Sequence, residues 1–385
     1  MERNEMYGLL LTLLRCALTE EMPHLEISLS DAEWKALYLC ADYYDSAHLV
    51  GYALERASLL PDGNAGDAFR KKQMEAIWRT EQQEYEKEQV GAALEQAGIA
   101  HIFLKGAVLR RLYPQPWLRI GADMDVLVRK ENYEEAIRLL CTKLGCTLGL
   151  RTPHDVKLRF PSGQYTELHV QLSGTASANA LLSRAWETSL PVKETCWERM
   201  LAPEWFYVYH IAHMAKHFEQ GGCGIRPIQD LWIMERTMQR DEQETNDLLR
   251  EATLLTFAET AECLKDQWFS NGEGSALAQR MGDYILAGGT FGIVEKRVAV
   301  DQAKTGGRMK NFFARVFLPY ETLTEIYPPL KERPWRLPYY EVCRWCRLLF
   351  CGRAANVWAE LQKNQTISEK EIYATEILLK DLKLL

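Results

Sequence analysis

The chain has 385 residues, of which 47% are hydrophobic, and it carries a formal net charge of −7 at pH 7. This length and apolar content predict an ordinary globular protein of two or three domains with substantial cores. The acidic balance argues against a protein whose whole surface docks on nucleic acid, although it is compatible with a local basic groove. Nucleic acid is therefore not an obligatory partner.

The N-terminal sequence contains one early apolar run, GLLLTLL at residues 8–14. The run is too short to span a bilayer. The mixed charges of Glu2, Arg3 and Glu5 do not form the basic start of a signal peptide. Ten cysteines in a chain of this kind indicate reduced thiols rather than a disulfide framework. We therefore expect a cytoplasmic protein with no membrane partner.

Residues 1–95 are helical in pattern. DAEWKALYLCADYYDSAHLVGYALERASLL repeats apolar residues at helical spacing, and AFRKKQMEAIWRTEQQEYEKEQVGAALEQAG reads as one long amphipathic helix that ends at Gly98. These two stretches predict a helical N-terminal region.

Residues 96–175 have a shorter period and predict an α/β core. AHIFLK, MDVLV, VKLRF and ELHVQL are strand-like, and ENYEEAIRLLCTKLG predicts a helix that stops at Gly145. Residues 176–385 return to helical patterns, interrupted by the proline-rich YPPLKERPWRLP at residues 327–338. The predicted fold class is α+β, with a small mixed β-sheet embedded between helical N-terminal and C-terminal regions.

The run LRIGADMDVLV places two aspartates at the start of a strand-like segment. Because side chains alternate across a strand, Asp123 and Asp125 project from one face, and Met124, Val126 and Val128 project from the other. Two like charges on one face repel and raise each other's pKa unless cations compensate. The pair therefore indicates a cation site.

Two further stretches place charged or polar side chains on the same predicted sheet. In HIFLKGAVLRRLY an apolar strand runs into Lys105 and Gly106 and then into a predicted helix, a junction that presents backbone N–H groups to an anion. Glycine there also lets a ligand approach the backbone closely. In YTELHVQL, Glu167 and His169 share one strand face. On a neighbouring strand, Glu167 would add a third carboxylate to the aspartate pair.

Three carboxylates together suit hard divalent metals such as Mg²⁺, which proteins bind through such oxygens together with substrate phosphates. The natural interpretation is phosphoryl or nucleotidyl transfer. In a two-metal arrangement, one ion lowers the pKa of an attacking hydroxyl, and both stabilise the charge that develops on phosphorus and leaving group. Asp125 would bridge both ions, and Asp123 would help to hold them. Glu167 would bind the ion on the acceptor side and accept the hydroxyl proton.

The succession LKG, LYPQPWLR, DMDVLV, an amphipathic helix and a later acid-bearing strand resembles the DNA polymerase beta-like nucleotidyltransferase superfamily. The likeness is strongest to a bacterial group described as uncharacterised nucleotidyltransferases. It implies a small mixed sheet flanked by helices, a glycine-containing turn near the triphosphate, and a carboxylate pair that binds two Mg²⁺ ions. On this chain Gly106 matches the turn, Asp123 and Asp125 match the pair, and Glu167 matches the third acid. The usual turn has serine after glycine, whereas Ala107 follows here.

The sequence thus predicts a metal-dependent nucleotidyltransferase that moves a nucleoside monophosphate from an NTP, with ATP expected, to an unidentified hydroxyl acceptor. The predicted catalytic and metal-binding residues are Asp123, Asp125 and Glu167, with Mg²⁺ or Mn²⁺ as the cofactor. The predicted nucleotide-binding residues are Lys105, Gly106 and Arg119. The acceptor stays open between a small molecule such as a sugar alcohol, a protein hydroxyl and an RNA end.

Some of these residues also have structural interpretations. Glu167 is typical of an exposed strand face as well as of a metal site. Arg119 suits either bidentate contact with a phosphate or an ion pair with Asp123. Asp230 follows Arg226 by four residues, which is typical of an i,i+4 ion pair on a helix, and it also suits a role in closing the cleft.

Two other clusters offer the residue types of a zinc site. The first is an H-x2-H-x3-H series on one predicted helix, formed by His210, His213 and His217. The second is the run CRWCRLLFC, with Cys343, Cys346 and Cys351. Neither an HExxH motif nor a second pair of cysteines accompanies them, so packing is the favoured interpretation. The histidine helix would then face the carboxylate cleft, and the cysteine run would be one helix.

Two alternative functions remain compatible with the sequence. The fold could persist as a nucleotide-sensing or partner-binding module of the toxin–antitoxin or defence type, which the absence of serine after Gly106 favours. The protein could also be a helical scaffold whose central sheet is only structural. The aspartate pair argues against the binding module, because two repelling charges on one face serve little purpose in a protein that binds no cation. Metal-dependent NTP binding would separate the scaffold from the other two functions, and turnover would separate the enzyme from the binding module.

Overall fold

The computed structural model describes residues 3–19, 28–152, 154–194, 196–270, 272–289, 294–305, 309–310, 317–318, 320–350 and 367–385. The chain divides into two compact units. One consists of Met1–Ala215 with Ile225–Gly282, and the other of Lys216–Gly224 with Asp283–Leu385. The sheet and the candidate site described below lie in the first unit.

The helices that precede the sheet are α1 (Arg3–Thr19), α2 (Asp31–Tyr43), α3 (Ala47–Arg56) and α4 (Asn64–Gln96). The backbone N–H of Ser30 donates to the Glu33 carboxylate at 3.0 Å, which satisfies a donor at the start of α2. The 33-residue α4 ends just before Gly98, whose φ of +68° is a left-handed conformation that glycine adopts without a Cβ clash. The predicted long helix is confirmed.

The described strands form one seven-stranded mixed sheet in the order β3-β4-β5-β2-β1-β7-β6. Their bounds are β1 (His101–Phe103), β2 (Asp123–Val128), β3 (Thr147–Arg151), β4 (Asp155–Arg159), β5 (Tyr165–His169), β6 (Leu190–Pro191) and β7 (Glu198–Met200). At the centre β2 pairs parallel with β5 and antiparallel with β1. The short helical turns after β1 are α5 (Gly106–Leu109), η1 (Arg110–Leu112) and η2 (Pro116–Leu118). The predicted α+β class is confirmed.

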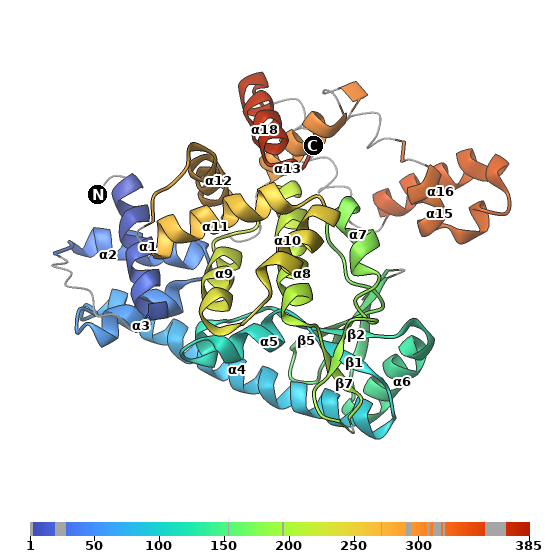
Figure 1. Cartoon of the computed structure of the whole chain (residues 1–385), viewed down its shortest axis with the longest axis horizontal. Helices are drawn as coiled ribbons and strands as arrows, with labels where there is room; N and C mark the ends of the chain where they lie inside the picture. The colour runs from blue at the N-terminus through green and yellow to red at the C-terminus, as the bar shows by residue number, and fades with distance from the viewer. Residues whose placement is uncertain are drawn as a thin grey trace. The chain divides into compact units, whose positions relative to one another are not determined.

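One face of this sheet packs on helices α4 and α6 (Tyr133–Leu144), which Figure 1 shows beside the strands. Turn η3 (Lys130–Asn132) leads into α6, and the helix ends at Gly145 with φ of +67°. The shared core contains Met124, Val126 and Val128 of β2, together with residues of β4 and β5. The other face of β2 is thus left for its aspartates, as the alternation of the sequence predicted.

The strand-like runs predicted from the sequence correspond to β1, β2, β4 and β5. The sequence did not predict β3, β6 and β7. Each residue of β3 is exposed, so an alternation of buried and exposed side chains is missing there. Strands β6 and β7 have only two and three residues, and such short segments gain their conformation by pairing with the sheet rather than from their own pattern.

Helices dominate the described part of the chain after β5, where the short strands β6 and β7 follow the first of them. They are α7 (Ala176–Leu182), α8 (Pro203–Glu219), α9 (Arg226–Thr237), α10 (Glu242–Glu251), α11 (Leu255–Phe269), α12 (Ala276–Leu286), α13 (Val294–Thr305), α15 (Tyr320–Ile326), α16 (Leu337–Phe350) and α18 (Glu369–Asp381). The proline-rich run forms the turns η4 (Pro328–Leu330) and η5 (Pro334–Arg336). None of the described helices combines the length and apolar character needed to cross a bilayer.

The predicted single helix over LPYYEVCRWCRLLF is α16, which carries Cys343 and Cys346 as free thiols. The third cysteine of that run, Cys351, lies outside the described residues.

Candidate functional site

The pairing of β2 with β5 brings the sequence-predicted carboxylates together. The two strands are parallel, and Asp125 lies opposite Glu167, while Asp123 lies opposite Tyr165 and Leu127 opposite His169. Because side chains two residues apart on a strand share a face, Asp123, Asp125, Glu167 and His169 all project from the side away from the helical core. Strand pairing therefore brings these acids together although 36 residues separate β2 from β5.

Asp125 is the most deeply buried acid of the group, with 4% of its surface exposed. Its Oδ1 accepts hydrogen bonds from Lys105 Nζ at 2.9 Å and from His169 Nε2 at 2.7 Å. An ionised carboxylate only accepts, so the proton of this imidazole lies on Nε2. Burial by itself raises the pKa of Asp125, but the Lys105 charge and the His169 contact outweigh it and bring the pKa well below its ordinary value. The lowered pKa favours the ionised form of Asp125 at neutral pH.

Lys157 of β4 connects the other two acids. Its Nζ lies 3.5 Å from Asp123 Oδ2 and 3.1 Å from Glu167 Oε1. The antiparallel register of β4 and β5 sets Lys157 opposite Glu167, so the contact follows from strand pairing. Burial together with the charges of Asp125 and Glu167 raises the pKa of Asp123 to about 6. Burial and repulsion from the neighbouring carboxylates together outweigh the effect of the two lysines on the pKa of Asp123.

Lys105 reaches Asp125 because the chain turns sharply after β1. Its backbone has φ of +44°, a left-handed conformation that is uncommon outside glycine, and α5 begins at the next residue. Burial lowers the pKa of the Lys105 ammonium, but Asp125 and Tyr209 of α8 raise it more, so it lies above its ordinary value. The predicted junction of strand, Lys105, Gly106 and helix is confirmed, and α5 is only four residues long.

Gly106 packs against the guanidinium of Arg119. A Cβ at this position would lie 3.1 Å from Arg119 Nη1, which is tighter than ordinary contact. Arg119 is itself held by α9, because its Nε and Nη2 donate to Asp230 Oδ1 and Oδ2 at 2.9 Å each. The hydroxyl of Tyr113 donates to the same carboxylate at 2.7 Å. The turn at Gly106 therefore packs against the buried ion pair of Arg119 and Asp230.

The partners of these charged groups differ from the ones that the sequence suggested. Arg119 pairs with Asp230 and not with Asp123. The expected i,i+4 pair between Arg226 and Asp230 is wrong, because Arg226 pairs with Asp45 of the loop after α2. Sequence spacing identifies neighbours on one helix, whereas buried charges select partners by tertiary geometry. Asp230 consequently ties α9 to the segment before β2.

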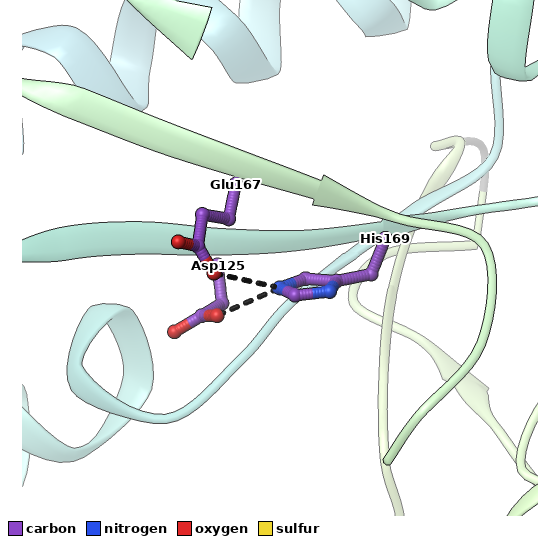
Figure 2. A group of neighbouring side chains, drawn as sticks. All are labelled: Asp125, Glu167 and His169. Atoms are coloured by element: carbon purple, nitrogen blue, oxygen red, sulfur yellow. Dashed lines mark hydrogen bonds and ion pairs between the residues drawn. The ribbon is translucent and has the colours of Figure 1, made fainter. Parts of the chain in front are cut away.

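Among the described residues, the group of three side chains able to hold a metal ion is Asp125, Glu167 and His169, whose ligand atoms lie within 4.8 Å of one another. Figure 2 shows the His169 ring directed at both carboxylates. Its Nε2 is 3.8 Å from Glu167 Oε2. The predicted set was instead Asp123, Asp125 and Glu167. The sequence pattern did place His169 on the face of Glu167, and that alternation was the signal for its participation.

The predicted histidine series does not join this group. His210 Nε2 contacts the carbonyl oxygen of Pro227 at 3.0 Å, and burial lowers its pKa. The ring of His213 lies 6.0 Å from that of Tyr209. No metal-ligand group that includes His210, His213 or His217 occurs in the described part of the chain. The packing interpretation favoured from the sequence holds for His210, whose ring contacts the backbone of α9.

A cleft of about 400 Å³ lies elsewhere in the first unit, between α10 and α11. Tyr207 and Arg240 line it, together with acidic residues such as Glu259. None of the acids or lysines that converge on β2 and β5 contributes to its wall. The candidate site is the sheet surface and not this cleft.

Residues 30–270, more than half of the chain, match the family described as "Uncharacterised nucleotidyltransferase". The chain belongs to this nucleotidyltransferase family. The match contains each residue of the site described above, from Lys105 to Asp230. It confirms the family resemblance drawn from the sequence.

Two other comparisons concern single proteins. No curated protein is significantly similar to the chain. The chain is similar to the crystal structure of an antigenic nucleotidyltransferase-like protein from Paracoccidioides brasiliensis, with 16% sequence identity and a TM-score of 0.29. That similarity covers 49% of this chain and 92% of the other.

The donor atoms of this nucleotidyltransferase family member fit a divalent cation. Carboxylate oxygens are the preferred ligands of Mg²⁺ and Mn²⁺, and a neutral imidazole nitrogen is a common ligand of transition metals. Burial, and then the charges of Asp125 and Glu167, raise the pKa of Asp123. A cation bound to Asp125, Glu167 and His169 would reduce the repulsion between these carboxylates.

Proposed function

We propose that the protein is a nucleotidyltransferase that moves a nucleoside monophosphate from an NTP, with ATP expected, to a hydroxyl acceptor. The observation that supports this function is the convergence of Asp123, Asp125 and Glu167 on one face of paired strands. The chain belongs to a family named for nucleotidyl transfer, and the convergence lies within the matched residues. An NTP is the substrate that this name implies.

In the proposed reaction the acceptor oxygen bonds to the α-phosphorus while the bond between that phosphorus and the bridging oxygen to the β-phosphate breaks. Pyrophosphate leaves with the electrons of the broken bond, and the hydroxyl proton passes to a base. A divalent cation held by the site carboxylates would supply Lewis-acid stabilisation of the charge on the phosphates.

The exposure of each carboxylate indicates which role it takes in the proposed reaction. Asp125 is buried and its pKa is lowered, so it is suited to hold the cation. Glu167 is partly exposed, with 27% of its side chain accessible, so an acceptor hydroxyl can approach it and pass its proton to a carboxylate oxygen. Asp123 is accessible to a similar degree and adds a further oxygen to the same face.

Lys105 and Gly106 are proposed to contact the triphosphate. Lys105 places an ammonium beside Asp125, where it can offer a further hydrogen bond to a phosphate oxygen. Gly106 has no side chain, so phosphate can approach the backbone at this turn. Asp230 holds Arg119 through two hydrogen bonds, and Arg119 packs against Gly106. We therefore propose that Arg119 stabilises the Gly106 turn.

Calorimetric titration with each NTP, in Mg²⁺ or Mn²⁺ and again in EDTA, tests the proposal. We expect one NTP to bind only when the metal is present, and the double variant Asp123→Asn and Asp125→Asn to lose that binding. A matched control is the double variant Asp67→Asn and Asp247→Asn, which removes two exposed acids of α4 and α10. The control should bind the NTP as the parent chain does.

Pyrophosphate release, measured with candidate hydroxyl acceptors of each class, then separates an enzyme from a binding module. Release that requires the metal and both aspartates supports nucleotidyl transfer. Metal-dependent binding without release under any acceptor favours the nucleotide-sensing module. If no NTP binds, or if the aspartate variant binds as tightly as the parent, the proposal fails.

A further inference from the structure

The charges already present at the candidate site limit how many metal ions it accepts. Three carboxylates meet two ammonium groups there, since Lys105 contacts Asp125 and Lys157 contacts both Asp123 and Glu167. The three carboxylates and two ammonium groups together carry a net charge of −1. Before a nucleotide binds, one divalent cation changes this charge to +1, whereas two would leave +3 among side chains that are 6–35% exposed. Repulsion between positive charges that lie within a few ångströms of one another disfavours the second ion in the absence of nucleotide.

Lys157 occupies the oxygens that a second ion would need. A metal that bridged Asp123 and Glu167 would bond carboxylate oxygens at about 2.0–2.6 Å. The Lys157 ammonium instead approaches Asp123 Oδ2 at 3.5 Å and Glu167 Oε1 at 3.1 Å. Its position is set by the register of β4, because Lys157 lies directly opposite Glu167 in the sheet. The contact between Lys157 and Glu167 is thus a cross-strand side-chain pair of the sheet.

Glu167 presents its two oxygens to different partners. Oε1 faces Lys157, and Oε2 faces His169 Nε2 at 3.8 Å. The oxygen on the His169 side can join Asp125 around one ion together with Nε2 of the imidazole, which binds a metal as the tautomer protonated on Nδ1. Figure 2 shows these three side chains directed toward one another. The Glu167 carboxylate can therefore bind a metal through Oε2 while Oε1 contacts Lys157.

We propose that the candidate site takes a single divalent cation, held by Asp125, Glu167 and His169, and that Lys157 supplies the second positive charge by bridging Asp123 and Glu167. This inference rests on the proposed nucleotidyl transfer, and it replaces the two-ion arrangement that the family resemblance implies. Lys157 is a positioning residue for the two acids. Mn²⁺ is the suitable probe, because it accepts carboxylate and imidazole ligands and is paramagnetic.

Electron paramagnetic resonance of the full chain with Mn²⁺ alone counts the bound ions. Spectra with Mn²⁺ and an ATP analogue whose α,β-bridging oxygen is replaced by methylene then show whether two ions lie together. Two Mn²⁺ ions about 3.5–4 Å apart give a coupled spectrum, and one gives an isolated-ion spectrum. We expect one Mn²⁺ per chain without nucleotide and an isolated-ion spectrum with the analogue.

Three variants assign the effect to the named residues. Lys157→Gln should admit a second ion and give the coupled spectrum, whereas Lys157→Arg, which keeps the charge, should give the isolated-ion spectrum. His169→Gln should weaken Mn²⁺ binding by about tenfold or more. Lys143→Gln is the matched control, because Lys143 is an exposed lysine of α6 that contacts Gln96 and not the site. It should behave as the parent.

A coupled spectrum from the parent chain, or no Mn²⁺ binding in the absence of nucleotide, would overturn the inference. An isolated-ion spectrum from a folded Lys157→Gln would overturn the role of Lys157. If that variant does not fold, the spectrum of the parent still decides the number of ions. Failure of the analogue to bind would count against the proposed function, while the Mn²⁺ count without nucleotide tests the inference separately.

Discussion

Arg119 and Asp230, which are 111 positions apart in the sequence, form a buried bidentate ion pair with both contacts at 2.9 Å. Asp230 is 1% exposed, and its pKa lies below the ordinary value because Arg119 outweighs the effect of burial. The pair joins helix α9 to the segment that leads into β2, where the site aspartates begin. Through Gly106 it also supports the turn after β1.

Removing one member of this pair should be strongly destabilising. Asp230→Asn leaves the Arg119 guanidinium buried without its counter-charge, and such changes cost about 3–5 kcal/mol of unfolding free energy. Urea unfolding followed by circular dichroism measures this cost. The exposed pair of Arg151 with Glu134 offers the comparison, because Glu134→Gln should cost less than about 1 kcal/mol. Equal losses at the two pairs would contradict a special role for Asp230.

Gly106→Ala should weaken both stability and nucleotide binding. Its new Cβ would lie 3.1 Å from Arg119 Nη1, and Asp230 prevents that guanidinium from moving away freely. Such overpacking costs about 1–3 kcal/mol. Gly8→Ala provides the control, since a Cβ at that position of α1 meets nothing within 4 Å. Alanine there should stabilise the helix by about 0.5–1 kcal/mol.

Lys105→Gln should weaken NTP binding by about 10–100-fold, which corresponds to the loss of one charge-assisted hydrogen bond. The variant also leaves Asp125 with His169 as its remaining partner among the contacts described, so some loss of stability is expected as well. Calorimetric titration under conditions where both proteins are folded separates the two effects. Undiminished NTP affinity in a folded Lys105→Gln would remove this lysine from the nucleotide site.

Acid should destabilise the protein partly through His48. Its Nε2 donates to the carbonyl oxygen of Leu118 at 3.1 Å, and burial lowers its pKa to about 3 despite that contact. As the pH falls, His48 is therefore protonated near pH 6.5 in the unfolded chain but only near pH 3 in the folded chain. Stability contributed by neutral His48 is complete above pH about 6.5 and declines as the pH falls toward 3, by about 2 kcal/mol at pH 5.

The pH dependence of unfolding in His48→Gln tests this assignment. Glutamine retains an N–H donor for Leu118 but does not titrate, so the decline of stability between pH 6.5 and 5 should be smaller by about 2 kcal/mol. His154→Gln, at an exposed position, leaves His48 in place and should keep the full decline. Parallel pH profiles for the parent and His48→Gln would show that other groups cause the acid sensitivity.

The sequence by itself determined the elements whose periodicity is strong. Alternation over DMDVLV predicted which side chains of β2 enter the core, and the glycine at position 145 predicted the end of α6, because these signals are local. It also identified the carboxylates that meet across β2 and β5, and the family to which the chain belongs.

Only the tertiary structure decided which charges become partners. Strand register brings Lys157 to Glu167 and His169 to Asp125, and helix packing brings Asp230 to Arg119. A buried charge is stabilised by a counter-charge within hydrogen-bond distance. Which residues come that close is decided by packing between segments that are far apart in the chain. The edge strands also depended on the assembled sheet, because pairing supplies the conformational preference that their own residues lack.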